Sequence, residues 1–117
     1  MIPDDDYEMI ESVLYLPMLL RILERDRVIF EQSAVKFKLP YIKLMDETIK
    51  RVRKELKSAK SYLRNENIIL EKLGVNGDFT AYRVFYKGYI EDRNYWNVRL
   101  RNRTEELLEQ YLNDGRI

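Results

Sequence analysis

The sequence predicts a mainly α-helical fold, with a kinked N-terminal helical element, a long central helix, a small β-hairpin at residues 79–96 and a C-terminal helix. Two observations carry this prediction. Apolar residues recur at three- and four-residue steps over residues 42–73, a stretch without proline or glycine. The aromatic segment FTAYRVFYKGYIEDRNYW then fills residues 79–96, with Gly88 near its middle. A chain of 117 residues is expected to form one domain, residues 1–117.

The N-terminal element is expected to run from about Asp5 to Glu31. Acidic residues at its start favour the positive end of a helix dipole. Apolar residues then recur at helical spacing. Pro17 lacks the backbone donor of an interior helical residue, and it disfavours helical backbone at Leu16. We therefore expect a kink at Pro17, or a break into two helices.

The central helix is expected to begin near Pro40, which suits the first helical position, and to end at Leu73 with Gly74 as its cap. Its apolar seam follows a heptad lattice. The seam consists of Ile42, Met45, Ile49, Val52, Leu56, Ala59, Leu63, Leu70 and Leu73. At about 1.5 Å per residue this helix would be roughly 50 Å long. Either the other helices cover it together in a monomer, or a second copy of the chain covers part of it.

Two patterns compete for residues 79–96. As a helix, the segment forms one aromatic stripe, but Gly88 in mid-helix costs about 1 kcal/mol and several large apolar residues fall outside the stripe. This alternative gives an all-α three-helix bundle. As a hairpin turning at residues 87–88, the segment pairs opposite charges and aromatic rings, which stabilise cross-strand neighbours. The facing pairs would be Phe79–Trp96, Tyr82–Arg93, Arg83–Asp92, Phe85–Ile90 and Tyr86–Tyr89. We favour the hairpin, followed by a helix over residues 98–113 that Asn97 caps.

The composition excludes many kinds of active site. The chain has no cysteine and no histidine, so it lacks a thiolate nucleophile, an imidazole base and the usual zinc ligands. The acidic run at residues 4–6 does not have the spacing of a calcium-binding loop. We therefore expect no catalytic residues, no metal, no other cofactor and no enzymatic activity, and the sequence identifies no small-molecule substrate. The acidic N-terminus and the short apolar run at residues 13–20 predict a cytoplasmic protein without a membrane span.

Basic residues cluster in the second half of the central helix. Residues 50–64 hold seven lysines and arginines against Glu55 alone, a local net charge of +6 in a chain of net charge +1. Those that lie away from the apolar seam are Lys50, Arg51, Lys54, Lys57 and Arg64. Such a face can neutralise phosphates, which makes a nucleic-acid-binding accessory protein the alternative function. A solvated face, or one paired with the acidic first helix, explains the same residues without a ligand.

Aromatic residues of the hairpin are interleaved with cations. The set consists of Tyr82, Tyr86, Tyr89, Tyr95 and Trp96. Aromatic rings beside cations can hold single-stranded nucleic acid, but the familiar folds that do so need more strands than two. A structural hairpin packed on the helices is favoured, with a protein-binding surface as the next interpretation. The predicted function is a non-enzymatic module for protein–protein interaction, with a protein partner or a second copy.

Four short motifs resemble a known family. They are YLPMLL at residues 15–20, FKLPY at 37–41, FYKGY at 85–89 and LRNRTEELL at 100–108. Together they are similar to the small YhjD-like proteins of spore-forming bacilli over nearly the whole chain. The resemblance implies a mostly helical, intracellular bacterial protein, and it supplies no catalytic or binding residues.

Overall fold

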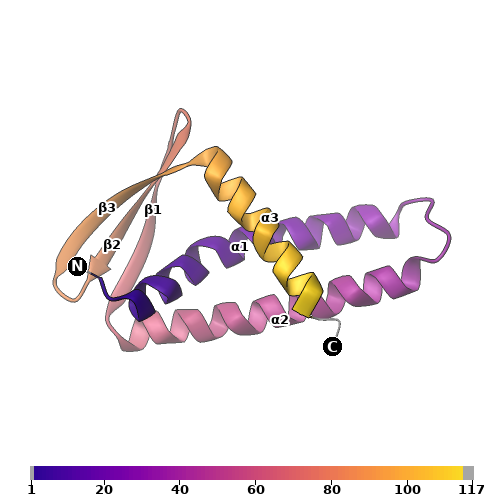
Figure 1. Ribbon diagram of the computed structural model, residues 1–117, viewed down its shortest axis with the longest axis horizontal. Helices are drawn as coiled ribbons and strands as arrows, with labels where there is room; N and C mark the ends of the chain where they lie inside the picture. Colours follow the sequence, from indigo (N-terminus) through magenta and orange to yellow (C-terminus); the bar gives the residue numbers. More distant parts are fainter. Residues whose placement is uncertain (1, 115–117) are drawn as a thin grey trace.

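The computed structural model of the protein describes residues 2–114, which form three helices and a three-stranded antiparallel sheet (Figure 1). In chain order the elements are α1 (Asp4–Glu31), α2 (Lys38–Asn65), β1 (Ile68–Asn76), β2 (Phe79–Tyr86), β3 (Tyr89–Trp96) and α3 (Asn97–Asp114). The strands follow one another in the sheet in the order β1-β2-β3. This is an α+β fold, so the mainly α-helical prediction is wrong, and the all-α bundle is not supported.

The error lies in the last part of the predicted central helix. α2 ends at Asn65, and Asn67 has a left-handed backbone with φ of 56° that turns the chain back. The β-branched residues that follow Asn67 begin β1, which pairs along its length with β2. Gly74, the predicted helix cap, instead lies in this strand next to the register irregularity between Lys72 and Gly74. Leu70 continued the heptad lattice only by coincidence of spacing.

The predicted hairpin is confirmed in position and register. All five predicted facing pairs, from Phe79–Trp96 to Tyr86–Tyr89, are partners in the β2–β3 ladder. Lys87 and Gly88 have φ of 44° and 101°, and two positive values in a row are what a two-residue type I′ turn requires. The hairpin is therefore one half of a larger sheet, because β1 adds a third strand to its other side.

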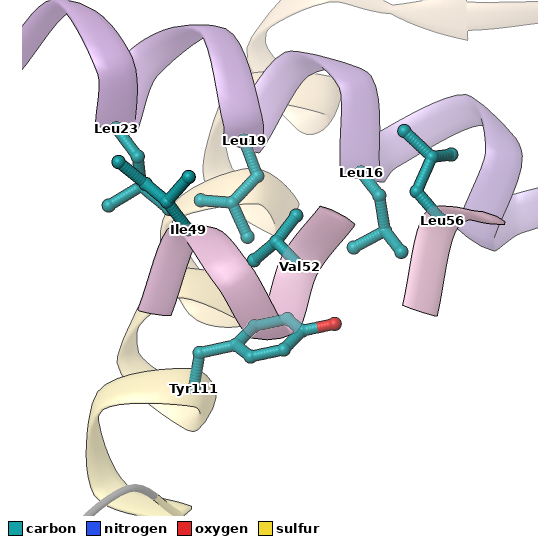
Figure 2. Close-up of a cluster of buried hydrophobic side chains, with 7 residues drawn as sticks. All are labelled: Leu16, Leu19, Leu23, Ile49, Val52, Leu56 and Tyr111. Carbon is teal, nitrogen blue, oxygen red and sulfur yellow. The ribbon is translucent and has the colours of Figure 1, made fainter. Parts of the chain in front are cut away.

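Helices α1 and α2 form a long antiparallel pair, and α3 crosses both of them (Figure 1). α1 continues through Pro17, so the predicted alternative of a break into two helices is wrong. Where the three helices meet, buried side chains from each form one cluster (Figure 2). Its buried members are Leu16, Leu19, Leu23, Ile49, Val52, Leu56 and Tyr111. The predicted seam is thus a core over its middle part.

The sheet is covered by helices on one face. Along β2 the residues at even positions, from Thr80 to Tyr86, are buried, and the residues between them are only half-buried. The buried positions pack against the first half of α1, including Ile10 and Leu14, and against Leu63 of α2. None of the described helices combines the length and the apolar character that a membrane crossing requires.

Asn97 fixes the start of α3 to the sheet. Its backbone N–H donates to the carbonyl oxygen of Asp78 at 2.8 Å, and its side-chain amide donates to the carbonyl oxygen of Gly77 at 3.1 Å. The Thr80 hydroxyl donates to the side-chain carbonyl oxygen of Asn97 at 2.6 Å. The side chain of Asn97 therefore binds the β1–β2 turn, and the predicted capping of its own helix is wrong.

Candidate functional site

The predicted basic face on α2 consists of four exposed cations and one that is used inside the protein. Lys50, Lys54, Lys57 and Arg64 are exposed, and none of them forms an ion pair with a residue of the described chain. Arg51 is half-buried, since its guanidinium donates to the carbonyl oxygen of Tyr111 and lies 5.2 Å from the centre of that ring. Arg51 thus holds α3 against α2 rather than facing solvent.

The predicted aromatic surface is divided between the core and the exterior. Tyr82 and Tyr86 are buried under the helices, and Tyr95 is half-buried with its ring 5.7 Å from that of Tyr82. Tyr89 and Trp96 are exposed, but they lie at opposite ends of β3. The five residues therefore do not form one patch.

One carboxylate of the acidic run at residues 4–6 is buried and joins three elements. Asp6, in the first turn of α1, is only 6% exposed. It accepts hydrogen bonds from the hydroxyls of Tyr62 at 2.6 Å and of Tyr86, and the Lys87 ammonium lies 3.8 Å away. These phenol bonds lower the pKa of Asp6, and the same carboxylate raises the pKa of Tyr62 to about 12. Because protein donors occupy the carboxylate, the cluster serves to join α1, α2 and the β2–β3 turn.

A second feature is a cleft of about 590 Å³ between the first half of α1, the end of β3 and the start of α3. The residues that give it chemical character are Glu11, Tyr15, Tyr95, Trp96, Arg99 and Arg103. We call it the α1–α3 cleft. Only Trp96 and Tyr95 among these belong to the predicted aromatic set. The other residues could not be grouped from the sequence, because α1 and α3 are far apart along the chain and their crossing was not predicted.

The electrostatics of the α1–α3 cleft centre on Tyr15, which is 5% exposed. Burial raises the pKa of its phenol, and Glu11 raises it further, while Arg99 and Arg103 act in the opposite direction. The phenol is therefore a neutral hydrogen-bond donor at physiological pH. Arg103 also donates to Glu106 at 3.1 Å on the same helix.

A third feature is the end of the molecule where α1 meets α2, away from the sheet and from α3 (Figure 1). Large apolar side chains are exposed there. They include Val28, Ile29, Phe37, Leu39, Tyr41 and Leu44, and we call these six the apolar tip. Phe37 is 69% exposed and Leu39 is 82% exposed. A sequence signal for this surface exists, since the connector SAVKFKLP carries apolar residues that a solvated loop does not need.

No group of three acidic, histidine or cysteine side chains among the described residues could hold a metal ion. Asp6 of the acidic run turns inward to the tyrosines, and its neighbours Asp4 and Asp5 are exposed. The candidate surfaces are thus the basic face of α2, the α1–α3 cleft and the apolar tip.

Comparison with known proteins gives the chain a family. The family model described as "YhjD protein" matches residues 1–116. A protein of Bacillus subtilis (strain 168), named "Uncharacterized protein YhjD", is 36% identical over 109 residues, which cover 93% of this chain and 91% of the relative. No solved structure matches. The relative's name states no activity. On the agreement of the family model and the relative, the chain belongs to the YhjD family.

Proposed function

We propose that this YhjD-family protein is a non-enzymatic interaction module that associates with a second copy of itself through the apolar tip. The observation that carries the proposal is the exposure of six large apolar side chains at the end of the helical pair. Isolated exposed apolar residues are ordinary, but a group of this kind on one part of a surface is typical of an interface.

The total surface supports a partner as well. The chain exposes 8528 Å², whereas a compact monomer of 14.2 kDa exposes about 6,800 Å². Its extents are 54 × 33 × 18 Å, and its radius of gyration of 16.2 Å exceeds the roughly 13 Å of a compact domain of this length. The surplus of about 1,700 Å² is larger than the ~800 Å² that each partner contributes to a standard interface.

A second copy suits the tip because the charges around it have both signs. Lys36, Lys43 and Glu47 are close to the apolar residues along the chain, and Glu31 is already paired with Arg27 at 2.6 Å. In a two-fold interface the same patch faces itself, so a patch that carries both signs can pair its own cations with its own anions. A partner recognised mainly by charge would instead select a surface of one sign.

The test is the mass of the protein in solution. Light scattering after gel filtration, over a range of micromolar concentrations, should show a dimer that dissociates on dilution. Leu39→Glu should give a monomer, because it places a charge in the apolar contact. Ile69→Glu, on the uncovered face of the sheet, is the matched control and should leave the dimer intact. Circular dichroism checks that both variants are folded.

Two outcomes would overturn the proposal. One is a wild-type monomer at every concentration. The other is a dimer that Ile69→Glu disrupts and Leu39→Glu does not, since that result would move the interface to the sheet.

Nucleic-acid binding is the second candidate, and it is favoured by one observation: Lys50, Lys54, Lys57 and Arg64 are exposed cations without ion pairs to described residues. A gel-shift assay at about 50 mM salt with single- and double-stranded probes tests it. Binding should weaken steeply as salt rises, and Lys54→Glu with Lys57→Glu should abolish it. Absence of a shift with micromolar protein would remove this candidate.

A further inference from the structure

The hydroxyl of Tyr15 has no hydrogen-bond partner among residues 2–114, which the structure describes. Tyr15 is 5% exposed and packs beside Leu14, Tyr82 and Leu100. No described residue hydrogen-bonds to its hydroxyl, and no side-chain polar atom that is fully buried in the described chain lacks a partner. The hydroxyl therefore reaches solvent, and Tyr15 is one of the residues that line the α1–α3 cleft. Buried tyrosines normally satisfy this donor, so the cleft offers it to something that enters.

Two side chains of opposite charge on the walls of the α1–α3 cleft also have no ion-pair partner in the described part of the chain. Glu11 comes from α1 and Arg99 from α3, and neither forms an ion pair with a described residue. Both line the same cleft as Tyr15, and they act on the pKa of its phenol in opposite directions. The remaining charged pair on α3, Arg103 and Glu106, is internally neutralised at 3.1 Å. The cleft thus presents one free carboxylate, one free guanidinium and a neutral phenol donor.

The rim of the α1–α3 cleft is aromatic and held in place. Trp96 is 52% exposed, yet its ring centre lies 4.2 Å from that of Phe79 on the neighbouring strand. Val98 adds apolar surface beside it. A volume of about 590 Å³ lies within the range of roughly 300–1,000 Å³ that is typical of small-molecule sites.

We propose that the α1–α3 cleft binds a small zwitterion with an aromatic body, of the chemical class of the aromatic amino acids. Its carboxylate would bind Arg99 and accept from Tyr15, its ammonium would bind Glu11, and its ring would pack on Trp96. A simple anion would face Glu11 without compensation, and a simple cation would face Arg99. A zwitterion can pair with Glu11 and Arg99 at once, and an aromatic ring can stack on the exposed side chain of Trp96.

The protein carries its own reporter for this site, because Trp96 is its single tryptophan. L-phenylalanine, which does not contribute to tryptophan fluorescence, should change the Trp96 emission in a saturable way, and calorimetry should give the same dissociation constant. Two analogues each lack one charge: 3-phenylpropionate has no ammonium, and phenethylamine has no carboxylate. Each should bind at least about 10-fold more weakly, since each loses a charged hydrogen bond and leaves a wall charge unpaired.

Removal of either wall charge should abolish the discrimination against the analogue that cannot pair with that charge. Arg99→Gln should weaken L-phenylalanine binding and remove the disadvantage of phenethylamine, because the unpaired cation is gone. Glu11→Gln should do the same for 3-phenylpropionate. Tyr15→Phe should weaken L-phenylalanine about 10-fold without unfolding the chain, since only one hydroxyl is lost. Arg101→Gln, on the same helix but outside the cleft, is the control and should change nothing.

Three results would overturn the proposal. The first is a wild-type protein that gives neither saturable fluorescence change nor binding heat with L-phenylalanine. The second is equal affinity for L-phenylalanine and both analogues, which would mean that the ligand's ammonium and carboxylate do not contribute to binding. The third is a loss with Arg101→Gln as large as that with Arg99→Gln, which would place the ligand elsewhere.

Discussion

Leu19→Ala is the sharpest test of the way in which α1 packs on α2. Leu19 is fully buried, and Figure 2 shows it pointing toward Val52 in the cluster that the three helices share. The substitution removes three carbons, worth about 2.4 kcal/mol in transfer free energy at about 0.8 kcal/mol each. A residual cavity of about 60 Å³ would add about 1.5 kcal/mol. The expected loss in the free energy of unfolding is therefore about 4 kcal/mol.

Such a loss is large against the 5–15 kcal/mol by which a domain of this size is normally stable. Urea unfolding followed by circular dichroism measures it, and the melting temperature should fall by roughly 15 °C. Leu39→Ala makes the same chemical change at a side chain that is 82% exposed, so it should cost under about 0.5 kcal/mol. Because Leu39 belongs to the apolar tip, the comparison is made at two protein concentrations, which separates folding from association.

A loss under about 1 kcal/mol in the free energy of unfolding for Leu19→Ala would refute this packing, because truncation of a fully buried leucine in a close-packed core costs more than that. An equal loss for the two variants would refute it too, since both make the same chemical change and Leu19 is buried while Leu39 is exposed.

Three further predictions concern single positions. Gly88→Ala should lower the free energy of unfolding by about 1–2 kcal/mol in a chemical unfolding experiment, because φ of 101° disfavours a side chain. Apart from the two adjacent residues, no atom lies within 4 Å of the added carbon, so this loss comes from the backbone and not from a clash. Tyr111→Phe should cost about 1–2 kcal/mol by the same assay, because its hydroxyl donates to the Glu55 carboxylate. Asp6→Asn should destabilise the protein at neutral pH, and the difference from wild type should shrink as pH falls below about 4. The folded-state pKa of Asp6 is lowered from 3.8, so its contribution is present above that value and is lost as pH falls through the lowered pKa. A pH-independent difference in midpoint would contradict the role given to Asp6.

The hairpin was predictable because its signal is local. Turn residues, strand-forming residue types, aromatic pairs and opposed charges all lie within residues 79–96, and a shift by one residue would have broken every pair together. The end of α2 was not predictable by the same means. Leu70 fits the heptad lattice and the strand pattern equally well, and the turn at Asn67 depends on one residue in a left-handed conformation.

The candidate sites also differ in whether a local stretch of sequence indicates them. The apolar tip has a signal in the connector and the start of α2, where Val35, Phe37 and Leu39 alternate with lysines. The α1–α3 cleft has none, because it exists only where Glu11 and Tyr15 of α1 meet Arg99 of α3. Their meeting depends on the direction in which α3 leaves the sheet, and Asn97 sets that direction through bonds to the β1–β2 turn. Because most of β1 was predicted to be part of the central helix, the β1–β2 turn that holds Asn97 was not predicted, and neither was the direction of α3.

Helix α3 also decides whether the two proposed surfaces influence one another. Its first residue, Asn97, is bonded to the sheet, and near its other end Tyr111 is bonded to Glu55 and Arg51 of α2. Because hydrogen bonds hold α3 near both ends, we expect it to keep one arrangement, and coupling between distant sites needs a second arrangement that a ligand can select. The apolar tip lies beyond the crossing of α3, at the far end of the α1–α2 pair (Figure 1). Binding in the cleft and association at the tip are therefore expected to be independent, and each proposal stands or falls on its own experiment.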